Sequence, residues 1–103
     1  MNKKISDILP KAEILAQLAE KASKLAQAAL ELRRALDGTN PTPKSVEKNL
    51  LEELADIKVA FTVYLSDSKP YIKARVSEEI YKTAEIKLDR WLSRLETKEQ
   101  SDK

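Results

Sequence analysis

The sequence predicts an all-α protein, an antiparallel bundle of three main helices with a short turn at the N-terminus. Apolar residues recur at steps of three and four over three long stretches, which is the spacing of one face of an α-helix. Two short segments with proline and other turn residues separate these stretches, and proline prevents one helix from running into the next. One glycine in 103 residues, with 42% apolar and 35% charged residues, is typical of a helical globular protein rather than a disordered one.

The length predicts a single domain at residues 1–96, followed by a polar tail at residues 97–103. A chain of this size buries roughly two-thirds of the surface that its unfolded form exposes, which is enough for one small core. We therefore expect several copies to associate and complete the bundle.

The first element expected is a turn of helix within residues 1–9, whose apolar side is Ile5, Ile8 and Leu9. Pro10 then suits the first position of a long helix, because the N–H that proline lacks has no partner there. Gly38 is expected to end this helix in the left-handed conformation that glycine adopts readily. The apolar stripe expected to face the core consists of Leu15, Leu18, Ala22, Leu25, Ala29, Leu32 and Leu36.

The second helix is expected after a loop at residues 39–44, with Ser45 as its N-cap. It should run to about Ser66, with an apolar stripe at Leu50, Leu54, Ile57, Phe61, Tyr64 and Leu65. The third helix follows a second loop at residues 66–70, and Ser77 marks a position where it can break, since serine is a good cap. Residues from Thr97 onward are polar and expected to fray. The third apolar stripe consists of Ile72, Val76, Ile80, Ala84, Leu88, Trp91 and Leu95.

The absence of cysteine and histidine excludes several kinds of chemistry. Disulfides, thiolate or imidazole metal sites and a histidine general base are all ruled out. Any metal must sit on carboxylate oxygens and be a hard ion such as Mg²⁺. The net charge of +2 is too small for a protein that coats nucleic acid. No apolar run approaches the length of a membrane helix and the N-terminus lacks the apolar core of a signal peptide, so we expect a cytoplasmic protein.

Polar residues flank the apolar stripes of the first two helices. Glu53 and Asp56, three residues apart, share one face of the second helix. If the two helices pack antiparallel, these acids can face the flank of the first helix across a shallow groove. That flank consists of Gln17, Lys21, Lys24, Ala28 and Glu31. Such a pair of acids can hold one divalent cation, or it can be a solvated pair without function.

Three segments, LAEKASKLAQAALELRRALDGTNPTP, NLLEELAD and KLDRWLSRL, closely resemble the small MazG-like nucleoside triphosphate pyrophosphohydrolases found in phages and bacteria. The similarity covers about Leu15 to Leu95, apart from residues 66–77. The resemblance implies an all-α fold, assembly into dimers or dimers of dimers, and Mg²⁺ held by an EExxE signature on one helix and ExxD on the next. It also implies cleavage of a nucleotide between its α- and β-phosphorus atoms, in a bacterial cytosol if a phage encodes the chain.

The chain departs from that family pattern at two positions. Glu53 and Asp56 match ExxD, with Glu52 before them, whereas the first signature keeps only Glu20 and has Lys21 and Lys24 where carboxylates are expected. A family quartet at positions 21, 24, 53 and 56 carries a charge of −4, and here the four charges cancel. One ammonium about 4 Å from a dication repels it by about 2 kcal/mol in water, so we expect no cofactor and no catalysis.

The sequence therefore favours a catalytically impaired MazG-like protein that binds and sequesters a phosphorylated nucleotide, as a sponge for a host nucleotide signal. Lysine is a compact cationic phosphate binder. One alternative is a working Mg²⁺-dependent pyrophosphohydrolase with a shifted metal site formed by Glu20, Glu52, Glu53 and Asp56. The second is a non-catalytic interaction bundle, or a subunit that pairs with an active relative. Independently of these alternatives, Lys21 and Lys24 can pair with Glu53 and Asp56 as an interhelical ion-pair patch without function.

Other residues are weaker candidates for ligand contacts. Lys58 adds a positive charge near the ExxD motif, and Asn49 begins the same helix. The segment KLDRWLSRL, which closes the resemblance to the family, adds a group of three cations and an aromatic side chain. These can reach ligand phosphates or a neighbouring subunit. The alternative is that Trp91 lies in the core and the arginines extend around it to solvent. The complete set of expected ligand-binding residues is Lys21, Lys24, Asn49, Glu53, Asp56, Lys58, Lys87, Arg90, Trp91 and Arg94.

Overall fold

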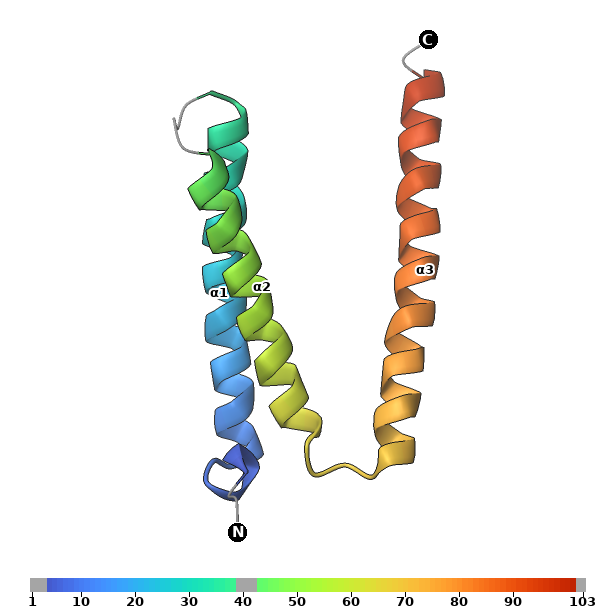
Figure 1. Ribbon diagram of the computed structural model, residues 1–103. Helices are drawn as coiled ribbons and strands as arrows, with labels where there is room; N and C mark the ends of the chain where they lie inside the picture. The colour runs from blue at the N-terminus through green and yellow to red at the C-terminus, as the bar shows by residue number, and fades with distance from the viewer. Residues whose placement is uncertain (1–3, 39–42, 102–103) are drawn as a thin grey trace. The chain divides into compact units, whose positions relative to one another are not determined.

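The computed structural model describes residues 4–38 and 43–101, and every regular element in these ranges is helical. A short 3₁₀ turn, η1 (Ile5–Asp7), precedes three helices, α1 (Lys11–Leu36), α2 (Pro43–Leu65) and α3 (Pro70–Ser101) (Figure 1). The all-α prediction is confirmed. Most of the loop predicted at residues 39–44 lies outside the described residues, as do residues 1–3 and 102–103. The chain forms two compact units, residues 1–67 and residues 68–103, which are described separately.

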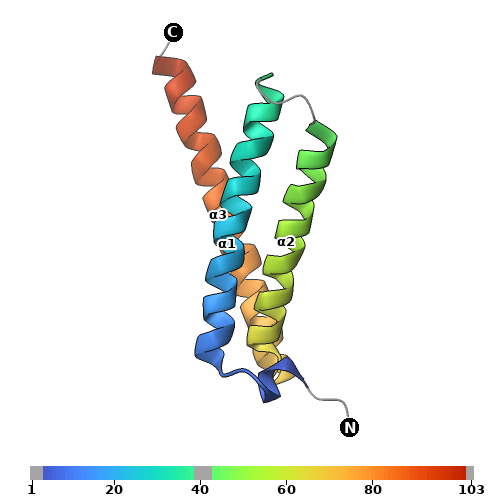
Figure 2. The ribbon, with the colours of Figure 1, turned by 90° about the vertical axis from the view of Figure 1, so that its left-hand side faces the viewer.

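In the first unit, α1 and α2 run antiparallel and lie side by side along their lengths (Figures 1 and 2). Pro10 is extended (φ −68°, ψ 157°) and its carbonyl accepts the first hydrogen bonds of α1, from the N–H groups of Glu13 and Ile14. It is therefore the cap before α1 rather than the first helical residue. α2 begins at Pro43, two residues before the cap predicted at Ser45, because proline is compatible with the first turn of a helix.

The end of α1 agrees with the sequence prediction. The N–H of Asp37 donates to the carbonyl of Arg33 at 3.0 Å, and the N–H of Gly38 donates to the carbonyl of Ala35 at 3.2 Å. Gly38 has a φ of +84°, the left-handed conformation expected for a helix-ending glycine.

The contact face of α1 differs from the predicted stripe by one residue. Glu31 is half-buried, and the other buried and half-buried positions follow steps of four and three residues: Ile14, Leu18, Lys21, Leu25, Ala28, Leu32 and Ala35. The predicted residues Leu15 and Leu36 are instead 45% and 73% exposed. Both stripes share the three leucines at positions 18, 25 and 32, so helical periodicity alone fits either of them. α2 packs on the side that carries Ile14 and the two smallest contact residues, where helix backbones can approach closely.

Small side chains make this α1–α2 contact close. Ala28 is 1% exposed, Ile14 3% and Ala35 5%, and Val46 on α2 is 9% exposed. Most of the stripe predicted for α2 is half-buried, although Leu54 is 46% exposed. Near the far end of the hairpin, the rings of Phe61 and Tyr64 stack with centroids 6.3 Å apart, and the Lys11 ammonium lies 5.0 Å from the centre of the Tyr64 ring.

The 3₁₀ turn η1 is attached to the segment that follows α2. The hydroxyl of Ser6 donates to Oδ1 of Asp67 at 3.0 Å, and the hydroxyl of Ser66 donates to that of Ser6 at 3.1 Å. Directly before η1, the backbone N–H of its cap residue Lys4 donates to Oδ2 of Asp7 at 2.9 Å. These bonds hold the predicted N-terminal turn against the hairpin, on the side where α1 begins and α2 ends (Figure 2).

The second unit contains α3, a continuous helix of 32 residues. The break considered at Ser77 does not occur. The helix also extends past Thr97, to Ser101. In its last turns the hydroxyls of Thr97 and Ser101 donate to the carbonyls of Ser93 and Thr97, at 2.9 and 3.2 Å. None of its residues is buried, and its large exposed apolar side chains are Tyr71, Ile80, Tyr81, Ile86, Leu88, Trp91, Leu92 and Leu95. Among the described residues, no helix combines the length and apolar character needed to cross a membrane.

The one-residue shift of the contact face gives a testable pair of variants. Ala28→Leu should destabilise the hairpin by about 1–3 kcal/mol, because the enlarged side chain overpacks a position with no free space. Ala29→Leu, one residue along on an exposed position, should change the free energy of unfolding by less than about 0.5 kcal/mol. Urea unfolding followed by circular dichroism measures both, and a larger effect at position 29 contradicts the observed contact face.

Gly38 offers a second test of the fold. A β-carbon built on Gly38 meets no atom within 4 Å, so the cost of Gly38→Ala is purely conformational. We expect a loss of about 1 kcal/mol in the free energy of unfolding, and a smaller loss for Gly38→Asn, since asparagine tolerates the left-handed region. Equal losses for the two variants would contradict a left-handed Gly38.

Candidate functional site

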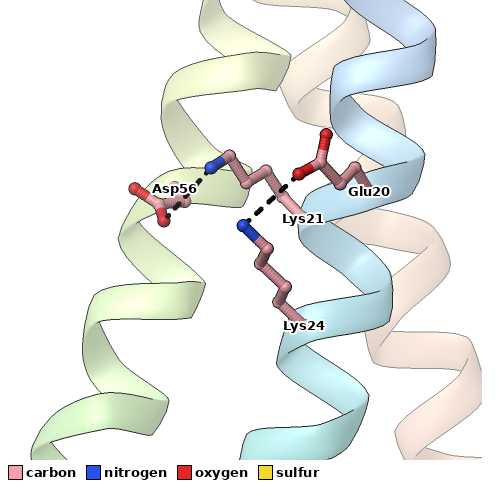
Figure 3. A network of polar contacts seen from close by, with 4 residues as sticks. All are labelled: Glu20, Lys21, Lys24 and Asp56. Atoms are coloured by element: carbon pink, nitrogen blue, oxygen red, sulfur yellow. Dashed lines mark ion pairs between the residues drawn. The ribbon is translucent and has the colours of Figure 1, made fainter.

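Lys21 lies within the contact face between α1 and α2. Its side chain is 28% exposed, and Nζ lies 3.8 Å from Oδ2 of Asp56 on α2, whose side chain is 47% exposed (Figure 3). The aliphatic stem of a lysine can pack along an apolar contact while its ammonium reaches the edge, which explains how a charged residue occupies this position. At this distance and exposure the ion pair contributes less than about 1 kcal/mol. The ammonium is therefore positioned by packing more than by its partner.

Lys24, one turn further along α1, pairs with its own helix. Its Nζ lies 3.3 Å from Oε1 of Glu20, and both side chains are about half exposed (Figure 3). A glutamate four residues before a lysine is the favourable order for such a pair, although it adds only about 0.3–0.5 kcal/mol. The arrangement in which both lysines pair with the ExxD acids thus holds for Lys21 with Asp56, and not for Lys24.

Glu53 lies between the two helices without a partner for one of its oxygens. The residue is half-buried, Oε2 is buried, and no described group donates a hydrogen bond to it. Asn49, one turn earlier on α2, is half-buried on the same face. A buried acceptor without a donor costs roughly 1–3 kcal/mol, so this oxygen favours any donor or cation that reaches it.

A cavity of about 230 Å³ opens between η1, α1 and α2, next to the Lys21–Asp56 pair. Its walls are apolar and come from all three elements: Ile5, Leu9, Ile14, Val59, Ala60 and Val63. Three polar side chains, Gln17, Lys21 and Asp56, lie along one edge. An apolar cavity with a few polar groups at one edge is the usual form of a site for a small organic ligand. Here the polar edge includes one positive charge, one negative charge and an amide.

The four carboxylates considered for a shifted Mg²⁺ site come from both helices, Glu20 from α1 and the other three from α2. Glu20 and Asp56 are each paired with a lysine ammonium, at 3.3 and 3.8 Å. In residues 4–38 and 43–101, no three acidic side chains come close enough together to hold a cation. Glu52 and Glu53, the remaining two, differ in burial, Glu52 being exposed and Glu53 half-buried.

The other predicted residues lie elsewhere. Lys58 is exposed on α2, outside the walls of the cavity. In the second unit, a hollow of about 440 Å³ on one side of α3 is lined by Lys87, Arg90, Trp91 and Arg94. The structure therefore brings this predicted group together on one helix face. Trp91 is 63% exposed on α3 of a single chain, and its interpretation as a core residue stays a prediction.

Two features of the site were missed in the sequence. Lys21 was expected beside the contact face and lies within it, because that face is rotated by one residue. The cavity was not anticipated either, although Ile5 and Leu9 before Pro10 were a signal that the N-terminal turn packs on something apolar. In comparisons with known proteins, no family model, curated protein or solved structure matches the chain.

The lysines in the groove predict a gain of function by charge reversal. A variant with both Lys21→Glu and Lys24→Glu places up to four carboxylates on the facing flanks, and should bind Mn²⁺, which carboxylate oxygens suit. Because a bound metal relieves their mutual repulsion, Mn²⁺ should raise the Tm of this variant by at least about 5 °C. The unmodified chain and a control with Lys58→Glu should show no such rise. An equal shift in all three proteins would contradict a role for the groove.

Proposed function

We propose that the α1–α2 hairpin binds a phosphorylated nucleotide, or a signal derived from one, and holds it without cleaving it. The observation that carries this proposal is the position of Lys21, an ammonium held in the helix contact face at the edge of an apolar cavity. A ligand that suits this place has a flat apolar ring and an anionic group attached to it. Nucleotides have both, and the resemblance to MazG-like proteins points to the same ligand class.

Phosphate binding is supported by the weakness of the existing ion pairs. Lys21 meets Asp56 at 3.8 Å, and Lys24 meets an exposed partner on its own helix. A phosphate offers each ammonium shorter, charge-assisted hydrogen bonds of about 1.5–3 kcal/mol. We therefore expect each ammonium to exchange its carboxylate partner for a phosphate oxygen. Both ammonium groups lie on the same side of α1, directed toward α2, so one ligand can meet both (Figure 3).

Base binding is supported by the cavity. Its apolar walls can accept the faces of a nucleobase, and Gln17 offers both a donor and an acceptor to the ring edge. The Asp56 carboxylate supplies a further acceptor for an exocyclic amino group. A ligand with a base and phosphates thus satisfies the two ends of the site at once.

Sequestration rather than catalysis is supported by the charges. Two of the four candidate carboxylates, Glu20 and Asp56, are paired with lysines, and these ammonium groups on the flank of α1 repel a dication. A protein that retains a nucleotide without turnover requires no metal. The role we propose is that of a sponge, which lowers the free concentration of a nucleotide signal. The proposed location is the cytoplasm.

Calorimetry with a panel of linear and cyclic nucleotides, in EDTA, tests the proposal. At least one nucleotide should bind, and Lys21→Met should weaken it by about 10–100-fold through loss of one charge-assisted hydrogen bond. Lys58→Met removes an equal charge outside the site and should leave the affinity within about twofold. Mass spectrometry of small molecules released from the heat-denatured protein identifies a retained ligand directly.

Two outcomes contradict the proposal. Absence of binding across the panel, with no small molecule released on denaturation, removes the binding function. Release of pyrophosphate from a nucleoside triphosphate with Mg²⁺, abolished by Asp56→Ala, would instead establish the pyrophosphohydrolase alternative.

A further inference from the structure

Four of the eight large exposed apolar side chains of α3, Tyr81, Leu88, Trp91 and Leu95, share one face with the spacing of a heptad repeat. Two positions of the repeat, conventionally a and d, form the seam of a coiled coil. On α3 the a positions are Ala74, Tyr81, Leu88 and Leu95, and the d positions are Ser77, Ala84, Trp91 and Lys98. The large members of this seam are all exposed, Tyr81 by 66%, Leu88 and Trp91 by 63% and Leu95 by 53%. The seam is apolar without a break from Tyr81 to Leu95.

The charges that flank this seam are segregated by sign. The e positions, on one side, are Glu78, Glu85, Leu92 and Glu99, and the g positions, on the other, are Lys73, Ile80, Lys87 and Arg94. One flank therefore has three acidic residues and no basic one, and the other has three basic residues and no acidic one. Flanking charges of this kind determine partner choice and orientation in coiled coils.

The parallel or antiparallel orientation of two paired α3 helices determines which of their charged flanks meet. In a parallel pair each g position meets the e position five residues further along the other helix, so opposite charges face each other. In an antiparallel pair, g meets g and e meets e, which places basic residues against basic and acidic against acidic. We propose that α3 pairs in parallel and in register with α3 of a second copy of this chain.

The proposed register has two specific cross-pairs on each side. Arg94 meets Glu99 of the partner subunit, and Lys73 meets Glu78 of the partner subunit. Glu78 also lies 3.0 Å from Lys82 of its own helix, so its carboxylate is shared, and the pair at positions 94 and 99 has the larger effect. Between these two cross-pairs along the helix, the aliphatic stem of Lys87 covers Leu92 of the partner subunit. A second copy is favoured over an unrelated partner because the helix carries both halves of its own charge pattern.

Cysteine cross-linking determines the orientation, because the chain contains no cysteine. Single variants Ala84→Cys and Leu95→Cys place a thiol at a d and an a position of the full-length protein. In the parallel pair each variant forms a disulfide-linked dimer by itself under mild oxidation. Ser93→Cys, at position f on the opposite side of the helix, should remain uncross-linked. In an antiparallel pair a positions face d positions, so neither seam variant links to itself, and this result would overturn the proposal.

Charge reversal tests the register in the same protein without oxidation. Arg94→Glu and Glu99→Arg, taken singly, place like charges opposite each other twice in the dimer and should each raise the dimer dissociation constant about tenfold. The double variant restores opposite charges and should return the constant to within about threefold of its original value. Sedimentation velocity measures these constants. A monomer at all concentrations, or a dimer that survives Leu88→Glu, would also overturn the proposal.

Discussion

The close contact between α1 and α2 is the constraint on which the first unit depends. Ala28 and Ala35 allow the helix backbones to approach, and the three leucines of the contact face fill the space beside them. That approach determines which face of α1 is turned toward α2, and with it the position of Lys21. It also brings Asp56 within 3.8 Å of the ammonium. The cavity beneath η1 exists because the two helices and the N-terminal turn meet at the end where the small residues give way to isoleucine and valine.

Most of the fold could be predicted from the sequence because its signals are local. Proline, glycine and the three- and four-residue steps determine three helices whose ends differ from the prediction by only a few residues. The face of α1 could not be chosen in the same way. Leu18, Leu25 and Leu32 belong equally to two adjacent stripes, so the choice depends on α2. Periodicity within one helix contains no information about its neighbour, and a one-residue shift is enough to exchange Leu15 for Ile14 in the core.

The candidate site could likewise be predicted only in part, because some of its features depend on contacts between elements. The ExxD acids and the two lysines were identified from residue type and spacing, and the structure brings Lys21 and Asp56 together. The partner of Lys24 was not predictable, because Glu20 on the same helix and Glu53 on the other are both within reach of a flexible side chain. The cavity depended on hydrogen bonds of Ser6 with residues about 60 positions away in sequence, Ser66 and Asp67. Long-range contacts of this kind leave little trace in local patterns.

Lys21 links the stability of the hairpin to the proposed binding of a ligand. A leucine at this position would continue the apolar contact face, and replacing a buried or half-buried ion pair by apolar side chains is often neutral or stabilising. The loose pair with Asp56 adds little to the stability of the hairpin. The neighbouring Glu53 oxygen, buried without a donor among the described residues, is an unfavourable polar group in the same contact. A ligand can satisfy polar groups that the fold leaves unsatisfied, and such groups occur at functional sites. For this reason the contact face itself, and not only the resemblance, favours a binding site between α1 and α2.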